Sequence, residues 1–345
     1  MPDGANTDKE MRDIAVAGLD LGTNNCRLLV ARPSGKAFQV TDSFSRPVRL
    51  GEGIEASGEL SSKAMDRAIE ALAICADKVR RADVSAFRAV ATAACRQADN
   101  GRLFADRVQA ETGVTLEIID SQEESRLAVS GCGPLVDPEA EHVLVFDIGG
   151  GSTELVLIDV SDIAPENRIK MVQAIGGDGP QAKVLNWMSA PVGVATLQDK
   201  FAEIVDPARR YALMTWYFEE LIADFGRPPM DEGREKRLQL IGASGSATTI
   251  GASYLGLRRY DRSKVDGLWV PVRAARRIAR ELASLPDATR AQHPSIGSDR
   301  AQLIVASCAI LTAILNTWPA QEVRVADRGL REGLIYTQIA GMNGA

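Results

Sequence analysis

The stretch DIGGGSTE, residues 147–154, decides the fold. One apolar run, residues 143–146, precedes it and another, residues 155–158, follows it, which predicts a strand, a tight turn and a second strand. Successive glycines let the backbone approach a ligand closely, and their amide N–H groups can form a concave anion site suited to phosphate. Taken alone, the turn is explained about as well by a plain hairpin.

The same arrangement occurs once before in the chain. Residues 14–19 are apolar, the polar turn DLGTNN follows at 20–25, and residues 26–31 are again mostly apolar. A repeated turn that begins aspartate, apolar residue, glycine predicts two lobes that share one sub-architecture and face each other. The repeat also favours phosphate binding over the plain hairpin.

Helical patterns follow each hairpin. Apolar residues between 65 and 79 recur on one face of a helix opened by Ser61, and Asp206 and Pro207 open another that runs to about Phe225. Strands alternating with helices indicate α/β layers. We therefore expect two ribonuclease-H-like α/β lobes: a disordered tail at 1–13, a first lobe at 14–131, a second at 132–330, and a final helix at 331–345 that packs back on the first lobe.

Composition excludes several classes of protein. The 345 residues are 45% hydrophobic and 25% charged, which is globular usage, and the net charge of −6 argues against general binding to nucleic acid or to a membrane. Five scattered cysteines without a C-x-x-C pair indicate neither disulfides nor zinc, and the N-terminus shows no apolar signal core. Residues 301–318 are apolar but interrupted by polar side chains, which predicts a buried helix. We expect a cytoplasmic protein.

One segment opposes the overall charge. Residues 258–280 hold eight basic side chains and two acidic ones. This pattern is typical of a solvated helix face, and it also suits a track for a polyanion.

Three carboxylates are candidate metal ligands. Asp20 and Asp147 each end an apolar strand, where a carboxylate beside phosphate calls for a divalent cation, and Glu154 leaves the glycine turn on the next strand. Magnesium is held by one or two carboxylates, waters and substrate oxygens. The alternative for the aspartates is turn capping, and for Glu154 an exposed strand position.

Further candidates lie at the ends of other strands. Glu124 follows a strand predicted at 117–120 and could orient water as a general base, although residues 121–124 also have the spacing of a capping box. Arg96 could place its guanidinium on a phosphate oxygen, or simply lie on the surface. Ser244 and Gly245 offer a further small-residue turn for phosphate, which an ordinary tight turn explains nearly as well.

Taken together these residues resemble the exopolyphosphatase/guanosine pentaphosphate phosphatase family of the actin-like ATPase and sugar-kinase superfamily. The matching motifs follow the family's order from about residue 14 to 335, which makes them specific as a set. They are DLGTN at 20–24, ATAACR at 91–96, EESRL at 123–127, DIGGGSTE at 147–154, PVG at 191–193, GASG at 242–245 and LREG at 330–333.

The resemblance implies two ribonuclease-H-like lobes with an active cleft between them, and magnesium-dependent release of the terminal phosphate of polyphosphate, guanosine pentaphosphate or both; manganese could replace magnesium. It also implies a homodimer. Residue by residue, the catalytic groups are Glu124 and Arg96; the phosphate-binding groups are Gly22, Thr23, Asn24, Gly149, Gly150, Gly151, Ser152, Thr153, Ser244 and Gly245; the metal ligands are Asp147, Glu154 and Asp20.

Two departures from the family pattern bear on substrate and packing. The chain stops soon after residue 333 and lacks the helical extension of long members, so we expect a preference for short polyphosphate. The family usually has Ser-Leu-Pro-x-Gly where this chain has SAPVG at 189–193, which leaves the packing of that loop open. A guanosine pentaphosphate 5'-phosphatase, a kinase or ATP-driven switch, and a sensor of phosphate polymers remain alternatives.

Overall fold

The computed structural model describes residues 14–343 apart from 36, 178, 227–236 and 298–299. The disordered tail expected at 1–13 lies outside the described residues. The strands are β1 (Ala15–Leu21), β2 (Asn25–Ser34), β3 (Ala37–Pro47), β4 (Val84–Ala91), β5 (Leu116–Ile118), β6 (His142–Ile148), β7 (Thr153–Asp159), β8 (Lys183–Ala190), β9 (Leu238–Ala243), β10 (Trp269–Pro271) and β11 (Glu322–Ala326).

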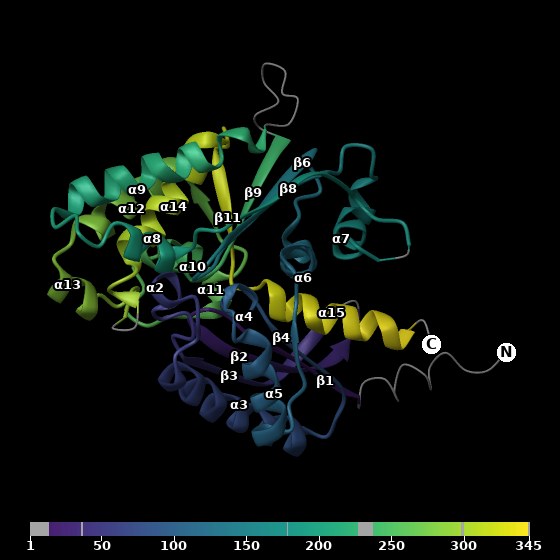
Figure 1. Ribbon diagram of the computed structural model, residues 1–345. Helices are drawn as coiled ribbons and strands as arrows, with labels where there is room; N and C mark the ends of the chain where they lie inside the picture. The colour runs from purple at the N-terminus through teal and green to yellow at the C-terminus, as the bar shows by residue number, and fades with distance from the viewer. Residues whose placement is uncertain (1–13, 36, 178, 227–236, 298–299, 344–345) are drawn as a thin grey trace. The chain divides into compact units, whose positions relative to one another are not determined.

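Helices follow the strands along the chain, as Figure 1 shows. They are α2 (Ile54–Ser57), α3 (Ser62–Ala82), α4 (Ala93–Gln97), α5 (Gly101–Thr112), α6 (Ser121–Cys132), α7 (Pro165–Gln173), α8 (Val194–Lys200), α9 (Pro207–Leu221), α10 (Gly245–Tyr254), α11 (Arg262–Val265), α12 (Val272–Ser284), α13 (Asp287–Gln292), α14 (Ile304–Thr317) and α15 (Leu330–Asn343), with short 3-10 turns at Gly133–Leu135 and Ala223–Phe225.

The chain divides into two compact units, each with its own sheet. Unit 1 comprises residues 1–127 and 330–345, and unit 2 comprises residues 128–329. The sheet of unit 1 has the order β3-β2-β1-β4-β5, and that of unit 2 the order β10-β11-β9-β6-β7-β8. In both, the first three strands are antiparallel neighbours. Strands β4 and β5 then run parallel to β1, and β9 and β11 run parallel to β6, while β10 pairs antiparallel with β11 at the edge of the second sheet. The predicted pair of ribonuclease-H-like lobes is confirmed by this shared order.

In unit 1 both faces of β1 are buried. Ala17, Leu19 and Leu21 join the core formed with α3 and α5, whereas Val16 on the opposite face packs with Ile335 of α15. The C-terminal helix α15 contacts β1 and β2. Gly18 of β1 allows this approach, since a Cβ there would lie 2.9 Å from the Cβ of Leu334.

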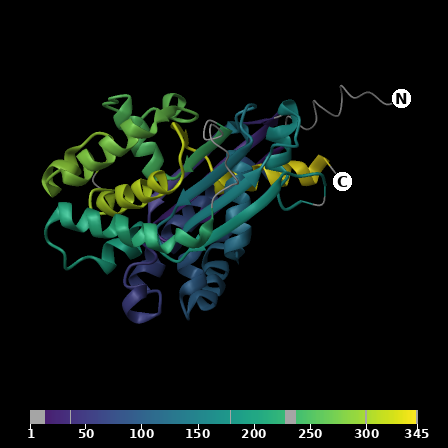
Figure 2. The same ribbon diagram turned by 90° about the horizontal axis from the view of Figure 1, so that it is seen from above.

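In unit 2 the central strand β6 is again buried on both faces. Leu144, Phe146 and Ile148 face the large core formed with the helices, and Val143 and Val145 face the smaller core on the side of α7. Helices α9, α12 and α14 pack on one another, and Figure 2 shows these green and yellow helices together beside the teal strands. Because both faces of this central strand are buried, polar side chains that reach a ligand must lie at its ends.

The helices predicted from local signals are confirmed. Ser61 caps α3 by accepting a hydrogen bond from the amide of Ala64, and Asp206 caps α9 by accepting one from Arg209. The apolar stretch near 301–318 forms α14, of which all residues from Ile304 to Leu315 are buried. None of the helices in the described part of the chain combines the length and apolarity that crossing a membrane requires.

Candidate active site

The two glycine-containing turns close in the same way. In unit 1 the amide of Gly22 donates to the carbonyl of Asn25 over 2.9 Å, and in unit 2 the amide of Gly149 donates to the carbonyl of Ser152 over the same distance. Each closing hydrogen bond thus spans four residues, 22–25 in unit 1 and 149–152 in unit 2. A Cβ on Gly149 would lie 2.9 Å from the carbonyl oxygen of Ser152, so the tight closure itself requires glycine there.

In unit 1 a neighbouring segment holds the carbonyls of the turn. The carbonyl oxygen of Asn24 accepts from the amides of Val48 and Arg49 at 2.8 and 3.0 Å, and that of Thr23 accepts from Gly51 at 3.0 Å. Peptide units are planar, so fixing a carbonyl on one side directs the amide of the next residue to the other side.

In unit 2 the first turn of α8 holds the carbonyls of the Gly149 turn. The amides of Val194 and Ala195 donate to the carbonyls of Gly149 and Gly150 at 2.9 and 2.8 Å. An ideal Cβ on Gly193 would lie only 2.5 Å from these backbone atoms, so glycine is required for the contact. The loop packing that the sequence left open is therefore well defined.

The amides of these turns are available to a ligand. Within the described chain, those of Thr23, Asn24, Gly150 and Gly151 find no acceptor. Amides that have no internal partner and lie beside carbonyls tied to the protein are donors prepared for an anion. Of the predicted phosphate-binding groups, Thr23, Asn24, Gly150 and Gly151 fit this description, whereas the amides of Gly22 and Gly149 close the hairpins.

The hairpins differ in the residue that stands across from the aspartate. Asp147 of β6 pairs with Glu154 of β7, and at the equivalent position Asp20 of β1 pairs with Arg27 of β2. Side chains of directly opposed residues lie on the same face of a sheet. Unit 2 therefore presents two carboxylates side by side, and unit 1 presents a carboxylate beside a guanidinium.

The carboxylate pair of unit 2 suits a divalent cation. Glu154 is buried, at 3% exposure, and one of its oxygens accepts a hydrogen bond from Ser189 over 3.0 Å. No cluster of three metal-binding side chains occurs among the residues the structure describes. Waters and substrate oxygens would therefore complete the coordination shell of a magnesium ion here, as they commonly do for this ion. Two neighbouring carboxylates without a cation would repel each other.

Asp20 has a different environment. Burial raises its pKa above the ordinary value, and the nearby Glu332 acts in the same direction, while Arg27 and Arg331 oppose the shift. Arg27 already supplies positive charge at this position. A cation is therefore less needed at Asp20 than at the carboxylate pair of unit 2, and the metal role suggested for Asp20 stays a prediction.

The turn at Ser244 lies beside Asp147. Strands β6 and β9 are parallel neighbours in which Asp147 pairs with Ala243, so Ser244 begins the turn at the same sheet edge. Ser244 has a φ of 107°, which is unusual for a residue with a side chain and is consistent with a backbone held for function. Its hydroxyl accepts from the amide of Ser246 at the start of α10.

In unit 1 the predicted catalytic pair is in direct contact. Arg96 donates to a carboxylate oxygen of Glu124 over 2.9 Å and to the carbonyl of Ile119 over the same distance. The side chains are 22% and 14% exposed, so both are largely shielded yet reachable. The backbone bonds from Thr92 to Leu21 and from Ile119 to Ala91 place both groups at the sheet edge that carries the Gly22 turn.

The capping-box alternative for Glu124 is wrong. Asp120 caps α6, because its side chain accepts from the amide of Glu123 at 2.8 Å, and the side chain of Glu124 binds Arg96 instead. The expected strand before this helix also ends earlier, at Ile118. The carboxylate of Glu124 is thus held in place by a guanidinium.

Sequence reasoning missed the residues that support these groups. Glu123 receives hydrogen bonds from Arg88 and Arg126, and although burial alone would raise its pKa, these two cations lower it. The segment that holds the Gly22 turn at Val48–Gly51 was missed as well. Its paired glycines, Gly51 and Gly53, were the available signal.

Comparison with known proteins agrees with this geometry. The model of the Ppx/GppA phosphatase family matches residues 29–341. A solved Ppx/GppA family member from Aquifex aeolicus is 25% identical, with a TM-score of 0.77 over 96% of this chain and 99% of the other. A solved exopolyphosphatase-like protein is 25% identical, with a TM-score of 0.80 over 96% and 99%.

A third similar structure is an exopolyphosphatase from Cytophaga hutchinsonii, which is 23% identical with a TM-score of 0.78 over 95% of this chain and 98% of the other; at that identity it supports the fold. The family match spans most of the chain and includes the Arg96, Glu124 and Asp147 positions. The chain therefore belongs to the Ppx/GppA phosphatase family.

Proposed function

We propose that this phosphatase is a magnesium-dependent exopolyphosphatase that removes the terminal phosphate of inorganic polyphosphate and favours short chains. The observation that carries the proposal is the pair of glycine turns whose carbonyls are tied back and whose amides find no acceptor in the described chain. Two such cradles suit a substrate with phosphate after phosphate, since each amide pair can bind one anionic group.

In the proposed reaction Glu124 orients the attacking water and accepts its proton. Arg96 fixes the carboxylate of Glu124, so it acts as a positioning residue. The amides of Gly150 and Gly151 receive the charge that develops on the phosphate oxygens. Positioning and charge stabilisation supply most of the rate enhancement in phosphoryl transfer.

Asp147 and Glu154 would hold magnesium, with manganese as a substitute. When bound, the cation neutralises phosphate oxygens and orients the chain. Ser189 contributes by fixing the carboxylate of Glu154 through its hydroxyl. That hydrogen bond restricts the rotation of the Glu154 carboxylate.

Glu124→Gln tests the base. Glutamine keeps the shape and can still accept from Arg96, but it cannot take a proton, so turnover of polyphosphate should fall about 100-fold or more with stability close to wild type. Near wild-type turnover would remove Glu124 from this role. Arg96→Lys is the companion variant: it keeps the charge, and it should lose less activity than Arg96→Met.

A double-mutant cycle of Glu124→Gln and Asp147→Asn tests whether the two residues act in one step. Groups that serve the same step give strongly non-additive losses, while independent groups give losses that multiply. Magnesium titrations should show a raised requirement in Asp147→Asn and an ordinary one in Glu124→Gln.

Substrate choice needs a direct comparison. Phosphate release should be measured at equal concentrations of tripolyphosphate, longer polyphosphate, guanosine pentaphosphate and ATP. Preferred release from guanosine pentaphosphate would replace the proposal with a nucleotide 5'-phosphatase, and transfer of phosphate to an acceptor would replace it with a kinase.

A further inference from the structure

The basic segment at 258–280 is only partly neutralised in the folded unit 2. Arg262 lies 3.5 Å from Asp327, Lys264 lies 3.4 Å from Asp261, and Arg277 pairs with Glu281 at 3.0 Å. Five further arginines have no acidic partner among the described residues. Arg276 is half-buried and donates to the carbonyl of Leu315, whereas Arg258, Arg259, Arg273 and Arg280 are exposed, in a chain whose net charge is −6.

Three of the arginines share one face of α12. Arg273, Arg277 and Arg280 are four and three residues apart, so they project on one side of the helix over about 10 Å of its length. The opposite face of α12 is buried and includes Ile278 and Leu282. The arginines are thus fixed on a rigid element that faces solvent.

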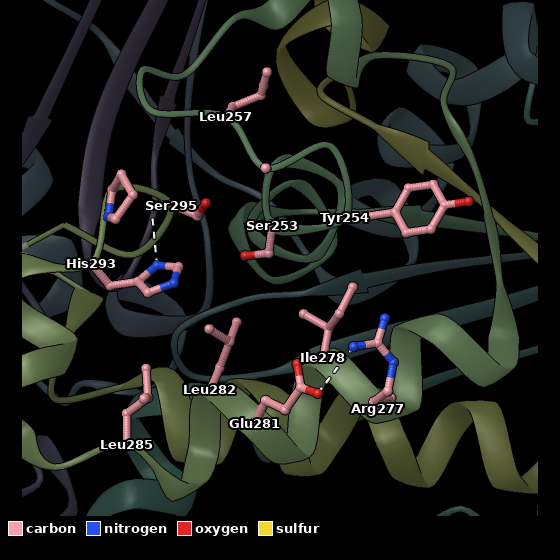
Figure 3. Close-up of a pocket in the computed structure, with 12 residues that line it drawn as sticks. Ser253, Tyr254, Leu257, Arg277, Ile278, Glu281, Leu282, Leu285, His293 and Ser295 are labelled. Carbon is pink, nitrogen blue, oxygen red and sulfur yellow. Dashed lines mark hydrogen bonds and ion pairs between the residues drawn. The ribbon is translucent and has the colours of Figure 1, made fainter.

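A hollow of about 390 Å³ lies beside this stripe (Figure 3). Arg277 and Glu281 of α12 border one side of it, and Ser253, Tyr254 and Leu257, at the end of α10 and just beyond, border the other. Arg258 and Arg259 directly follow Leu257. The hollow therefore has basic side chains on α12 and next to its opposite wall.

The hollow is lined by apolar side chains, such as Leu257 and Leu282, and by polar groups of which most can donate a hydrogen bond. The hydroxyl of Ser253 is buried and has no hydrogen-bond partner within the described structure. His293 accepts from the amide of Ser295 through Nδ1, which leaves Nε2 with the proton in the neutral ring. Glu281 is the single acidic side chain among the described residues of the lining, and it is already paired with Arg277.

We propose that the arginine stripe of α12 and this hollow form a second binding surface for the polyphosphate chain, separate from the sheet edge of unit 2 that carries Asp147 and the Ser244 turn. This inference rests on the proposed function. Helix α10 begins at the Ser244 turn and ends at the hollow, so the two are separated by about 13 Å. A chain held at the turn reaches the surface only if it is several phosphates longer than tripolyphosphate.

Length dependence follows from this separation. The binding affinity, as distinct from the turnover proposed to favour short chains, rises once the chain spans α10, because each arginine that meets a phosphate releases counterions. It then reaches a plateau, because the stripe ends at Arg280. A polyphosphate chain fits better than nucleic acid, since a three-arginine stripe on a protein of net charge −6 offers a short footprint.

The test is binding of defined-length polyphosphate to full-length protein carrying Glu124→Gln, which keeps the polymer intact. Adding Arg273→Gln, Arg277→Gln and Arg280→Gln should weaken long-chain binding at least tenfold at 0.1 M salt, with an effect that grows with chain length to the plateau. The slope of log affinity against log salt should fall by about 2 for three lost contacts.

Two controls keep the result interpretable. Arg80→Gln, Arg81→Gln and Arg102→Gln remove the same charge from exposed positions on unit 1 and should leave the length dependence intact. Replacing the three α12 arginines with lysine should restore most of the affinity. Because binding is measured without turnover, the surface is tested even if polyphosphate proves a poor substrate.

Two results would overturn the proposal. One is equal affinity of wild-type and triple-glutamine proteins for long chains. The other is tighter binding of a single-stranded RNA oligonucleotide than of polyphosphate with the same number of charges, which would assign the surface to nucleic acid.

Discussion

Gly193→Ala is the sharpest perturbation of the glycine turn in unit 2. The added Cβ would lie 2.5 Å from Gly149 O and from the carbonyl atoms of Gly150, all of which are backbone. Ordinary contact at about 3.5 Å requires a separation of about 1 Å between α8 and the turn. The φ of Gly193 is −116°, so the effect is steric and carries no conformational strain.

The magnitude follows from the contacts that the separation breaks. The bonds from Val194 and Ala195 to the turn, now 2.9 and 2.8 Å, would stretch beyond hydrogen-bonding range. Overpacking and two lost hydrogen bonds together predict a loss of about 2–4 kcal/mol in the free energy of unfolding. A displacement of about 1 Å in the phosphate cradle predicts about 100-fold lower kcat/KM for polyphosphate.

The assay combines urea unfolding with phosphate release. Gly179→Ala is the matched control, because no atom lies within 4 Å of its ideal Cβ and it belongs to the same unit. Wild-type stability and wild-type activity in Gly193→Ala would refute the claim that α8 holds the turn. Lost stability with full activity would refute the claim that the position of the turn matters for catalysis.

Three further predictions concern stability and reactivity. Gly333→Ala should destabilise the protein by about 3 kcal/mol or more in urea, because its Cβ would lie 2.0 Å from a backbone carbonyl, whereas Gly341→Ala on the same helix meets nothing and should be neutral. Lys78 lowers the pKa of Asp42 through hydrogen bonds, so ionised Asp42 stabilises the fold at neutral pH. This stabilisation is lost as the pH falls below the ordinary pKa of 3.8. Lys78→Met should therefore lower the free energy of unfolding by less than about 1 kcal/mol at pH 7, and a deficit that stayed constant down to pH 3 would contradict this. All five cysteines are buried, so Ellman's reagent should label none in the native protein and all five after unfolding.

Local signals explain what the sequence could predict. Hairpins, caps and buried helices depend on neighbouring residues, so the turns at 20–25 and 147–154 and the capped start of α3 were accessible without coordinates. The shared topology of the units followed from the repeat. Each hairpin and each cap is encoded by residues that are close in sequence.

Contacts between distant segments were not accessible in this way. Arg96 and Glu124 were both singled out, but their pairing depends on how β4, β5 and α6 stack at one sheet edge. The exact cap of α6 shifted by one residue, from Ser121 to Asp120, because both can accept the same hydrogen bond. The role of Gly193 depends on a helix that starts beside the turn in space and about 40 residues later in sequence.

The residues paired with Asp20 and Asp147 across the strands give the two hairpins opposite local charge. Beside Glu154, two carboxylates oppose an incoming anion, and the magnesium proposed above would offset this repulsion. Where Arg27 stands, the hairpin can attract an anion without such help. Chelation with EDTA should therefore weaken phosphate binding at the Gly149 turn and leave phosphate binding at the Gly22 turn unchanged. The residue opposite each aspartate, Glu154 or Arg27, accounts for this difference.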